Sequence, residues 1–435
     1  MENILASERA VKAASVNGTD IYRVDAEKFK TTSINFFFIG PLSSSNATMN
    51  ALLPAVLRRG NAKFNTLKSI SLQHEKLYGT SFDCGVTKKG ELHVIQFYTE
   101  FLSPMYVPGQ EDMFSKAFEL FSDIIFDPYL ENGCFKKEYV DQEKEKLRML
   151  IEGRVNDKMQ YCVERCLEEV CKDEPYGIYD YGSVDDLDRI NAEDLTKHYH
   201  KVIETYQLQV YLAGSVDDKQ IDTVKRKLGE IKRGEPVEIV SGFRLDRPKE
   251  VRYVTETMDV TQGKLCLGFR TNIAPGSSEY RALMVYNGVL GGGINSKLFQ
   301  NVREKASLAY YAYSRLEKFK GLMVISSGIE LKNREKALEI ILKQLEDIRN
   351  GIITEQELEG TVKNMVTGVQ SLSDNQMSIV DFYLSQKLSG SDDTFEDIIN
   401  SITSVTIADI VKAASNVVLD TVYFLTAPDN NPNNK

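Results

Sequence analysis

The sequence predicts an α+β fold built from two similar halves, and three observations support this prediction. First, segments of alternating apolar residues are interspersed with segments of helical period, in much the same order in both halves. Second, Ala51-Leu52-Leu53 and Gly60 correspond to Ala282-Leu283-Met284 and Gly291, each 231 residues further on. Third, a chain of 435 residues is long for a single hydrophobic core. An internal duplication accounts for all three observations.

The first half, residues 1–233, is expected to form one domain of short strands and helices. Thr48 can cap a helix over residues 49–58. A strongly charged helical stretch at 134–171 is expected to break near Gly153. Strands are expected at residues 18–24, 33–39, 81–88, 92–101 and 207–213, and further helices at 66–77, 110–126 and 192–202.

Residues 234–249 are expected to be a linker, because they combine turn residues with little periodicity. The second half, 250–435, repeats the order of strands and helices of the first half. In that repeat, Arg303-Glu304-Lys305 corresponds to His74-Glu75-Lys76. Strands are expected at residues 264–269, 310–315, 322–329 and 421–425, and helices at 279–289, 334–350, 354–372 and 403–414.

The composition is that of a globular protein and excludes several classes of partner. Hydrophobic residues make up 42% and charged residues 27% of the chain, and the net charge is −10. An acidic balance argues against nucleic acid and anionic membranes, and it permits cationic peptides. The longest apolar runs are strand-sized, so no membrane span is expected, and Met1-Glu2-Asn3 does not open an export signal. The six cysteines form no C-x-x-C pair, which favours reduced thiols and a cytoplasmic protein.

The most informative stretch begins with Gly291, Gly292 and Gly293, which either end one element tightly or let another chain come close. The three glycines are predicted to bind substrate. A helix is expected after them, ending near Ala306-Ser307, and an aromatic strand follows. Arg303 then lies near the end of the helix and Tyr310 at the start of the strand. A permanent cation and a phenol on rigid elements can together donate hydrogen bonds to a carbonyl oxygen or its oxyanion. Taken alone, the two residues favour a structural interpretation, with Arg303 a solvated helix-end cation and Tyr310 an ordinary strand aromatic.

This stretch resembles the second-half signature of the pitrilysin/insulinase family of zinc peptidases, also called inverzincins. In that signature a Gly-rich turn leads to Leu-Phe, then to Arg-Glu-Lys, and to a Tyr seven residues after the Arg, as Tyr310 follows Arg303. The resemblance implies two homologous α+β domains, each a mixed β-sheet with helices packed on one face. It also implies that the domains are joined by a linker and close like a clamshell around a chamber.

The first-half signature of the family is missing. Active members carry H-x-x-E-H on a helix, where the two histidines bind zinc and the Glu activates the metal-bound water. Ala51, Pro54 and Ala55 occupy those positions here, and none of them can donate a lone pair or act as a base. Glu138 and Glu145 match the spacing of the family's later glutamates, although in so charged a helix a solvated flank explains them better. No zinc or other cofactor is therefore expected on this chain.

The remaining residues do not suggest a replacement site. His198 and His200 would diverge on a helix and are expected at the surface, whereas His74 and His93 are isolated in the sequence. The Gly-rich turn lacks the pattern of a phosphate-binding loop.

By resemblance, the chain is expected to be the non-catalytic subunit of a heteromeric zinc peptidase. Some family members divide the work between two chains, of which one keeps H-x-x-E-H. Arg303 and Tyr310 would then act in trans, stabilising the oxyanion of a peptide substrate beside the zinc of the partner. One alternative is a stand-alone peptide-binding or scaffolding protein with no peptidase role. Another is an active peptidase with an unfamiliar site.

Overall fold

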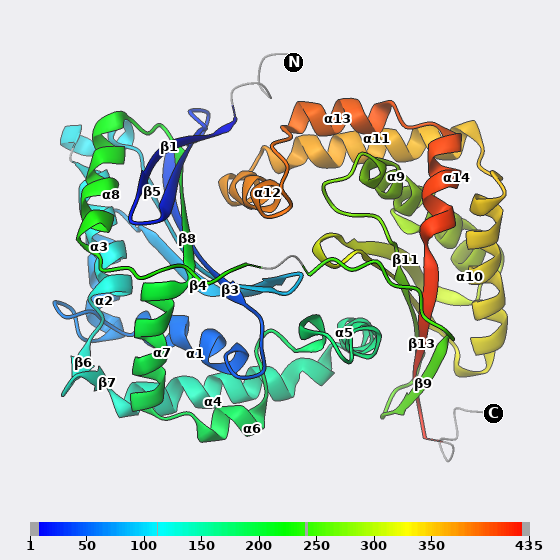
Figure 1. Cartoon of the computed structure of the whole chain (residues 1–435), viewed down its shortest axis with the longest axis horizontal. Coiled ribbons are helices and arrows are strands. Elements are labelled where there is room, and N and C mark those ends of the chain that lie inside the picture. Colours follow the sequence, from blue (N-terminus) through cyan, green and yellow to red (C-terminus); the bar gives the residue numbers. More distant parts are fainter. Residues whose placement is uncertain (1–7, 111, 240–241, 429–435) are drawn as a thin grey trace. The chain divides into compact units, whose positions relative to one another are not determined.

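Two mixed β-sheets organise the chain, one in each of two units (Figure 1). This computed structural model describes residues 8–110, 112–239 and 242–428. Met1-Glu2-Asn3, used above for the expected lack of an export signal, lie outside the described residues, as do residues 240–241 of the predicted linker. Unit 1 comprises Met1–Gly153, Ile178–Ser241 and Ser373–Ser385, and unit 2 comprises Arg154–Gly177, Gly242–Leu372 and Gln386–Lys435.

Unit 1 contains a six-stranded sheet in the order β1-β2-β8-β3-β5-β4. The β2–β8 pair is parallel and the other pairs are antiparallel. The strands are β1 (Ala10–Val16), β2 (Thr19–Asp25), β3 (Thr31–Pro41), β4 (Ser81–Lys89), β5 (Leu92–Leu102) and β8 (Gln207–Gly214), and a separate hairpin pairs β6 (Leu130–Glu131) with β7 (Cys134–Phe135). The helices are α1 (Ala47–Leu57), α2 (Leu67–Lys76), α3 (Met113–Phe126), α4 (Lys137–Gly153), α6 (Val184–Arg189), α7 (Ala192–Thr205) and α8 (Asp218–Glu230).

Strand β3 reads as a nearly continuous apolar run because both faces of the sheet are covered at that strand. Phe36 belongs to the core beneath the helices, and its ring centroid lies 5.0 Å from that of Phe121 in α3. Phe37 points to the other face, where it packs edge-on against Tyr211. The start of α12 (Gln376–Leu388) lies on that second face, and Lys89 pairs with Asp381 of this helix at 2.7 Å.

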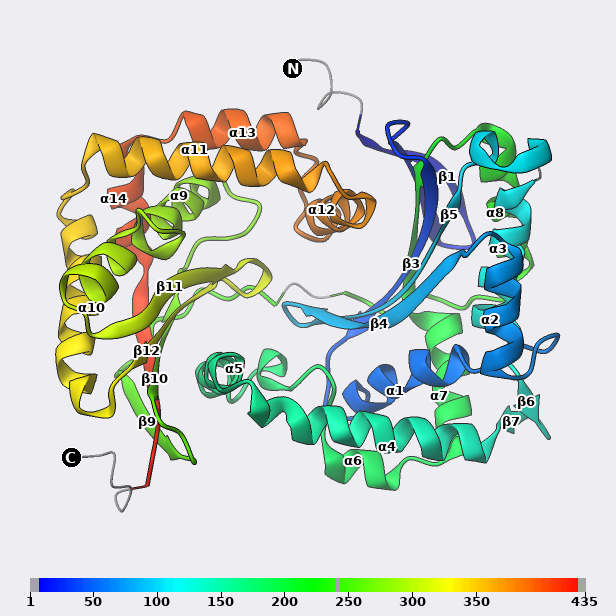
Figure 2. The same cartoon turned by 180° about the vertical axis from the view of Figure 1, so that it is seen from behind.

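Unit 2 contains a five-stranded sheet in the order β11-β12-β10-β13-β9. Figure 2 shows α10 on one side of this sheet and α5 on the other, and α5 contacts β10, β12 and β13. The strands are β9 (Arg252–Thr257), β10 (Gly263–Arg270), β11 (Ala309–Glu317), β12 (Leu322–Ile329) and β13 (Val418–Thr426). The helices are α5 (Lys158–Val170), α9 (Glu279–Gly291), the π-helix η5 (Phe299–Lys305), α10 (Arg334–Arg349), α11 (Glu355–Leu372), α13 (Phe395–Thr403) and α14 (Ile407–Asn416).

The topology of the two sheets confirms the predicted duplication. The order β2-β8-β3-β5-β4 in unit 1 corresponds to β9-β13-β10-β12-β11 in unit 2. The directions also agree, because β2–β8 and β9–β13 are the parallel pairs and every other pair is antiparallel. Both sheets are therefore mixed and carry their helices mainly on one face, as predicted.

Each unit borrows one segment from the other half of the sequence. Residues 154–177, which include α5, belong to unit 2, and residues 373–385, which include the first part of α12, belong to unit 1. The two helices hold equivalent places in the repeat, since α4 and α5 precede α6 as α11 and α12 precede α13. The contiguous domains 1–233 and 250–435 remain a prediction about the halves of the sequence, and they differ from these compact units. The predicted clamshell closure also stays a prediction.

Several local predictions need correction. Helix α1 begins at Ala47 with Asn46 as its N-cap residue, so Thr48 lies inside the helix, and α1 continues through Pro54. The helix expected after the Gly-rich turn is largely a π-helix. The break near Gly153 is confirmed, because α4 ends there and α5 begins at Lys158. The structure adds β1, β9, α6, α8, α12 and α13, which the periodicity did not predict.

Among the described residues, no single helix is both long and apolar enough to cross a membrane. One bent pair, α13 and α14 at 101°, meets that test jointly by length and composition alone.

Candidate functional site

The Gly-rich turn lies where α9 ends against strand β11. Gly291 is the last residue of α9, and a Cβ atom added to it would lie 2.4 Å from the backbone nitrogen of Ser314 in β11. Only a residue without a side chain allows the helix to approach the strand this closely. Gly293 is exposed, and its added Cβ would meet nothing closer than 3.9 Å, at Asn364. Gly291 therefore has a packing role, and the predicted substrate binding by the three glycines stays a prediction.

Arg303 lies on the π-helix η5 with its side chain 42% exposed. Buried Val302 anchors the π-helix, and the guanidinium carbon of Arg303 lies 4.5 Å from the centroid of the Phe299 ring. The aromatic face supports the side chain and leaves its N–H groups available at the surface. Glu304 is the nearest anion, at 3.7 Å from Nε of Arg303. π-Helical segments are frequent at functional sites.

Tyr310 lies at the start of β11 and is 56% exposed. Strand β11 and η5 are in contact, so the structure brings the elements of Arg303 and Tyr310 together. Between them the chain turns at Ser307, whose positive φ of 50° is uncommon for a residue with a side chain. A guanidinium and a phenol on adjacent elements, both open to solvent, can donate hydrogen bonds to an incoming carbonyl oxygen.

Two cavities lie beside this turn, both within unit 2. One of about 150 Å³ is lined by Gly288, Gly292, Gly293, Asn295, Ser296, Thr361, Asn364 and Met365. The other, of about 570 Å³, is more polar and is lined by Asn295, Gln300, Asn301, Lys305, Thr354, Gln356, Glu357, Glu359, Gly360 and Lys363. Amide and charged side chains of both signs make the larger cavity suitable for a polar ligand.

The zinc positions on α1 offer no ligands. Ala51 and Ala55 are partly buried, and Pro54 is buried inside the helix. Glu138 and Glu145 are 61% and 68% exposed on α4, and their nearest cations are Lys136 and Arg148. These residues do not fit a zinc ion, which needs imidazole, thiolate or carboxylate donors converging on one point. Among the described residues, no group of three or more His, Cys, Asp or Glu side chains is placed to hold a metal ion.

A buried polar network lies next to these positions, and the sequence did not predict it. Asn50 on α1 donates from Nδ2 to Nδ1 of His93 at 2.9 Å, and its Oδ1 accepts from Nε2 of His198 at 2.7 Å. The Tyr206 hydroxyl lies 3.2 Å from Nδ2 of Asn50. His198 is only 5% exposed, so its expected place at the surface is wrong, whereas His200 is exposed as expected. The signal available in the sequence was the pairing of Asn46 and Asn50 on one face of an otherwise apolar helix.

Burial determines the protonation of both histidines in this network. Burial, together with the charge of Lys88, lowers the pKa of His93 to about 4. Burial, followed by the charge of Lys201, lowers the pKa of His198 to about 4. Both rings are therefore neutral at pH 7, which suits the donor and acceptor pattern of Asn50.

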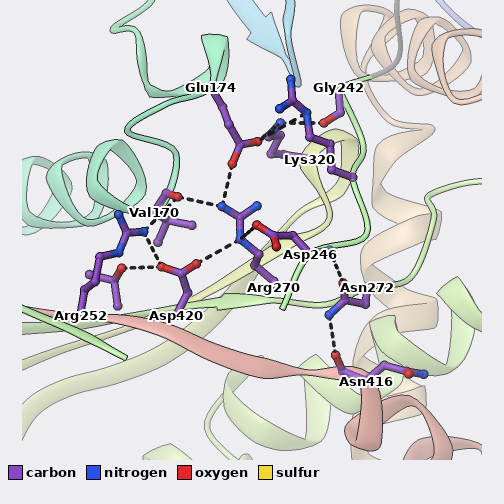
Figure 3. A network of polar contacts seen from close by, with 12 residues as sticks. Val170, Glu174, Gly242, Asp246, Arg252, Arg270, Asn272, Lys320, Asn416 and Asp420 are labelled. Atoms are coloured by element: carbon purple, nitrogen blue, oxygen red, sulfur yellow. Dashed lines mark hydrogen bonds and ion pairs between the residues drawn. The ribbon is translucent and has the colours of Figure 1, made fainter. Parts of the chain in front are cut away.

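A second buried network, of charged groups, lies in unit 2 (Figure 3). Lys320 is 2% exposed, pairs with Glu174 at 2.5 Å and donates to the carbonyl oxygen of Gly242 at 2.7 Å. Arg270 on β10 bonds both Glu174, at 2.6 Å, and Asp420, at 3.0 Å. These contacts hold the end of the borrowed segment 154–177 and the chain that enters unit 2 at Gly242.

The comparisons with known proteins agree with the predicted resemblance. A family model described as the peptidase M16 inactive domain matches residues 189–365. A Bacillus subtilis (strain 168) relative described as "Probable inactive metalloprotease YmfF" is 40% identical over 416 residues, covering 94% of this chain and 96% of the relative.

Solved structures match the whole fold. A conserved protein from Enterococcus faecalis V583 has a TM-score of 0.90 at 29% identity, covering 97% of this chain and 100% of that chain. The peptidase M16 inactive domain from Pseudomonas fluorescens has a TM-score of 0.78 at 17% identity, covering 97% of this chain and 98% of that chain. At 17% identity the second match concerns the fold alone.

Proposed function

This chain belongs to the pitrilysin/insulinase (M16) family as an inactive peptidase homologue, and from that membership we propose that it is the non-catalytic subunit of a heteromeric zinc peptidase. A partner chain with an intact H-x-x-E-H would hold the zinc and activate the water. This chain would bind the peptide substrate and stabilise the oxyanion in trans.

One observation carries the proposal: this chain lacks the first-half signature of the family and keeps the second-half signature. Ala51, Pro54 and Ala55 replace every group that would bind zinc or move a proton on α1. Arg303 and Tyr310 survive at the family spacing, and both are substantially exposed on adjoining elements. A donor pair that is open to solvent but lacks its own zinc requires a second chain for catalysis.

In the proposed complex, the residues of this chain supply hydrogen bonds and charge. Tyr310 donates its hydroxyl proton in a hydrogen bond to the carbonyl oxygen of the substrate as negative charge develops there. Arg303 keeps its positive charge throughout and stabilises the same oxygen. The exposed glycines of the turn allow the backbone of the substrate to approach.

Reconstitution with a family member that carries H-x-x-E-H tests the proposal. We expect the purified chain to cleave no peptide alone and the mixture to be active. Tyr310→Phe should lower kcat of the mixture by about a hundredfold, the usual effect of losing one oxyanion donor. The matched control is Tyr253→Phe, because Tyr253 is also an exposed tyrosine, 63% exposed on β9, and lies outside the Arg303–Tyr310 region.

Two outcomes would contradict the catalytic role of the pair. One is a reconstituted kcat that Tyr310→Phe leaves unchanged. The other is an equal loss with Tyr253→Phe, which would mean that the substitutions act through stability.

A stand-alone peptide-binding protein is the second candidate. It is supported by the net charge of −10 and by the polar cavity of about 570 Å³ beside the Gly-rich turn. Titration calorimetry of the chain alone with a basic peptide tests it. Salt-sensitive binding, without activity in the presence of any H-x-x-E-H partner, would favour this candidate over the first.

We also propose that the protein is cytoplasmic. Five cysteines are thiols in this structure, namely Cys84, Cys134, Cys162, Cys166 and Cys266, and the last three are fully buried. Reduced thiols are usual in that compartment.

A further inference from the structure

We propose that Cys162 and Cys266 form a redox modification site, at which a hydroperoxide oxidises the two thiols to a disulfide that fastens α5 to the sheet of unit 2. The inference depends on neither a partner nor the proposed peptidase role.

The two sulfur atoms are already in contact. Sγ of Cys162 on α5 lies 3.0 Å from Sγ of Cys266 on β10, and both residues are fully buried. A disulfide bond is about 2.05 Å long, so closure requires a movement of only about 1 Å. The next polar atoms are more distant, with the Lys264 carbonyl oxygen 3.4 Å from Cys162 and the Ser326 hydroxyl 3.4 Å from Cys266.

The packing of α5 fixes this pairing. Two residues beyond Cys266, β10 has Gly268, where an added Cβ would lie 2.4 Å from Val170 and 3.3 Å from the sulfur of Cys166. Because the strand has no side chain there, α5 lies directly on it. Cys166 therefore faces a glycine, whereas Cys162, one turn earlier, faces a thiol. The register of the helix selects one pair among the buried cysteines.

The reaction balances with one peroxide. The thiolate of one cysteine attacks a peroxide oxygen, the O–O bond breaks and hydroxide leaves, which gives a sulfenic acid. The second thiolate attacks that sulfur, the S–O bond breaks and a second hydroxide leaves. The two thiol protons neutralise the hydroxides, so two thiols and one hydrogen peroxide give one disulfide and two waters.

Burial controls when this reaction occurs. Burial and the neighbouring sulfur of Cys266 raise the pKa of the Cys162 thiol well above its usual value. The reactive thiolate is therefore scarce while α5 is packed, and it forms when the segment opens locally. Once formed, the bond links residues 104 positions apart. It would join a helix from the first half of the sequence to a strand from the second.

The disulfide would act as a covalent latch, that is, a crosslink that holds one end of the borrowed segment 154–177 on the sheet of unit 2. The other end is already held by charged groups, since Arg270 bonds the Val170 carbonyl at 2.8 Å and Glu174 at 2.6 Å. Figure 3 shows these contacts around Arg270. Near Cys162, α5 is held by packing and by Glu256 of β9, which accepts hydrogen bonds from Tyr161 at 2.7 Å and from Arg165 at 3.2 Å. The disulfide would add a covalent bond to these non-covalent contacts.

Treatment of the full chain with hydrogen peroxide, followed by non-reducing peptide mapping, tests the site. We expect one dominant intramolecular disulfide, between the peptides of Cys162 and Cys266. Cys266→Ala should abolish it, and Cys134→Ala, at a partly exposed cysteine in unit 1, should leave it unchanged. Sulfoxide at Met149, whose side chain is 64% exposed, reports that the oxidant was sufficient.

Hydrogen exchange measures the latch without any substitution. Amide exchange in residues 158–170 of the wild type should slow by about tenfold or more after oxidation and recover with dithiothreitol, because the crosslink restricts local opening. The proposal is overturned if Cys162 and Cys266 stay reduced when Met149 is fully oxidised, or if a different pair predominates. It is also overturned if the disulfide forms and exchange in α5 is unchanged.

Discussion

At the scale of single residues, missing side chains shape this protein as much as the side chains present. Gly291 allows α9 to end against β11, with only 2.4 Å between the position of a Cβ atom and the Ser314 nitrogen. Backbone atoms cannot move aside as the tip of a flexible side chain can. At Gly293 the same added atom would have 3.9 Å of room. Two residues of one glycine run therefore carry different constraints.

Alanine substitutions separate these two constraints. Gly291→Ala should lower the free energy of unfolding by about 1–3 kcal/mol, the usual cost of overpacking. Gly293→Ala should change it by about 0.5 kcal/mol or less. Urea denaturation of both variants measures the difference. Equal effects would mean that the contact between α9 and β11 is not tight.

The histidines of unit 1 give the protein a pH dependence with a defined sign. In the folded state His93 and His198 remain neutral down to a pH of about 4, because burial lowers the pKa of each. In the unfolded chain each ring binds a proton near pH 6.5. Between these values the unfolded state binds more protons, so folding stability falls as the pH falls, by up to about 1.4 kcal/mol per pH unit for each histidine.

Urea midpoints at several values between pH 7.5 and 4.5 test this dependence. His198→Gln should flatten the curve in that interval, because one of the lowered histidine pKa values is removed while the new amide can still donate to Asn50. The control is His200→Gln on the exposed side of the same helix, which should leave the curve unchanged. A wild-type curve that is flat from pH 6.5 to 5 would refute the assignment.

At the scale of elements, the C-terminal end of α5 is held by charged groups that the helix does not itself carry. Glu174, just beyond the helix, is 9% exposed in its side chain and lies between Lys320 and Arg270. Although burial opposes the shift, hydrogen bonds from Lys320 and Arg270 lower the pKa of Glu174. A buried cation that loses its partner is costly, even where the intact pair adds little stability.

Glu174→Gln should therefore destabilise unit 2 strongly. We expect a loss of about 3–5 kcal/mol in the free energy of unfolding, since Lys320 and Arg270 lose their shared carboxylate. Limited proteolysis within residues 154–177 should accelerate with it. Glu145→Gln, at a carboxylate 68% exposed, is the matched control and should change stability by about 0.5 kcal/mol or less. Similar losses in the two variants would show that the buried network contributes no more than a surface pair.

At the scale of the whole molecule, the two halves of the sequence complete each other. Without residues 373–385, one face of the unit 1 sheet, with Tyr211 and Phe37, loses its cover. Without α5, the face of unit 2 that includes Cys266 and Tyr423 is open to water. Exposed apolar faces of that kind favour aggregation over folding.

Separate halves test this dependence. Polypeptides 1–241 and 242–435 produced alone should lack a cooperative unfolding transition, because each misses the helix that the other supplies. Produced together, they should form a complex with a single cooperative transition. Circular dichroism melts and gel filtration measure both properties. Two halves that each melt cooperatively alone would show that the borrowed segments are dispensable.

Patterns of local sequence were sufficient to predict most of the architecture. The periodicity of β3, the charged stretch of α4 and α5, and the matched segments around Gly60 and Gly291 predicted strands, helices and a duplication, and the two sheets confirm them. The failures also have local causes. Thr48 was predicted to cap α1, but Asn46 is the N-cap residue. His198 was predicted to lie at the surface, but it is buried and bonds Asn50, which lies 148 positions away in the sequence.

The sequence by itself determined the chemistry that this protein lacks: at Ala51, Pro54 and Ala55 no arrangement of the backbone can supply a zinc ligand. It also determined the family, because the spacing from Gly291 to Tyr310 is a property of the chain. Only the tertiary structure decided which residues meet. Contacts such as Cys162 with Cys266 and Glu174 with Lys320 join segments far apart in the sequence. Their formation depends on how helices pack on sheets, which no local pattern encodes.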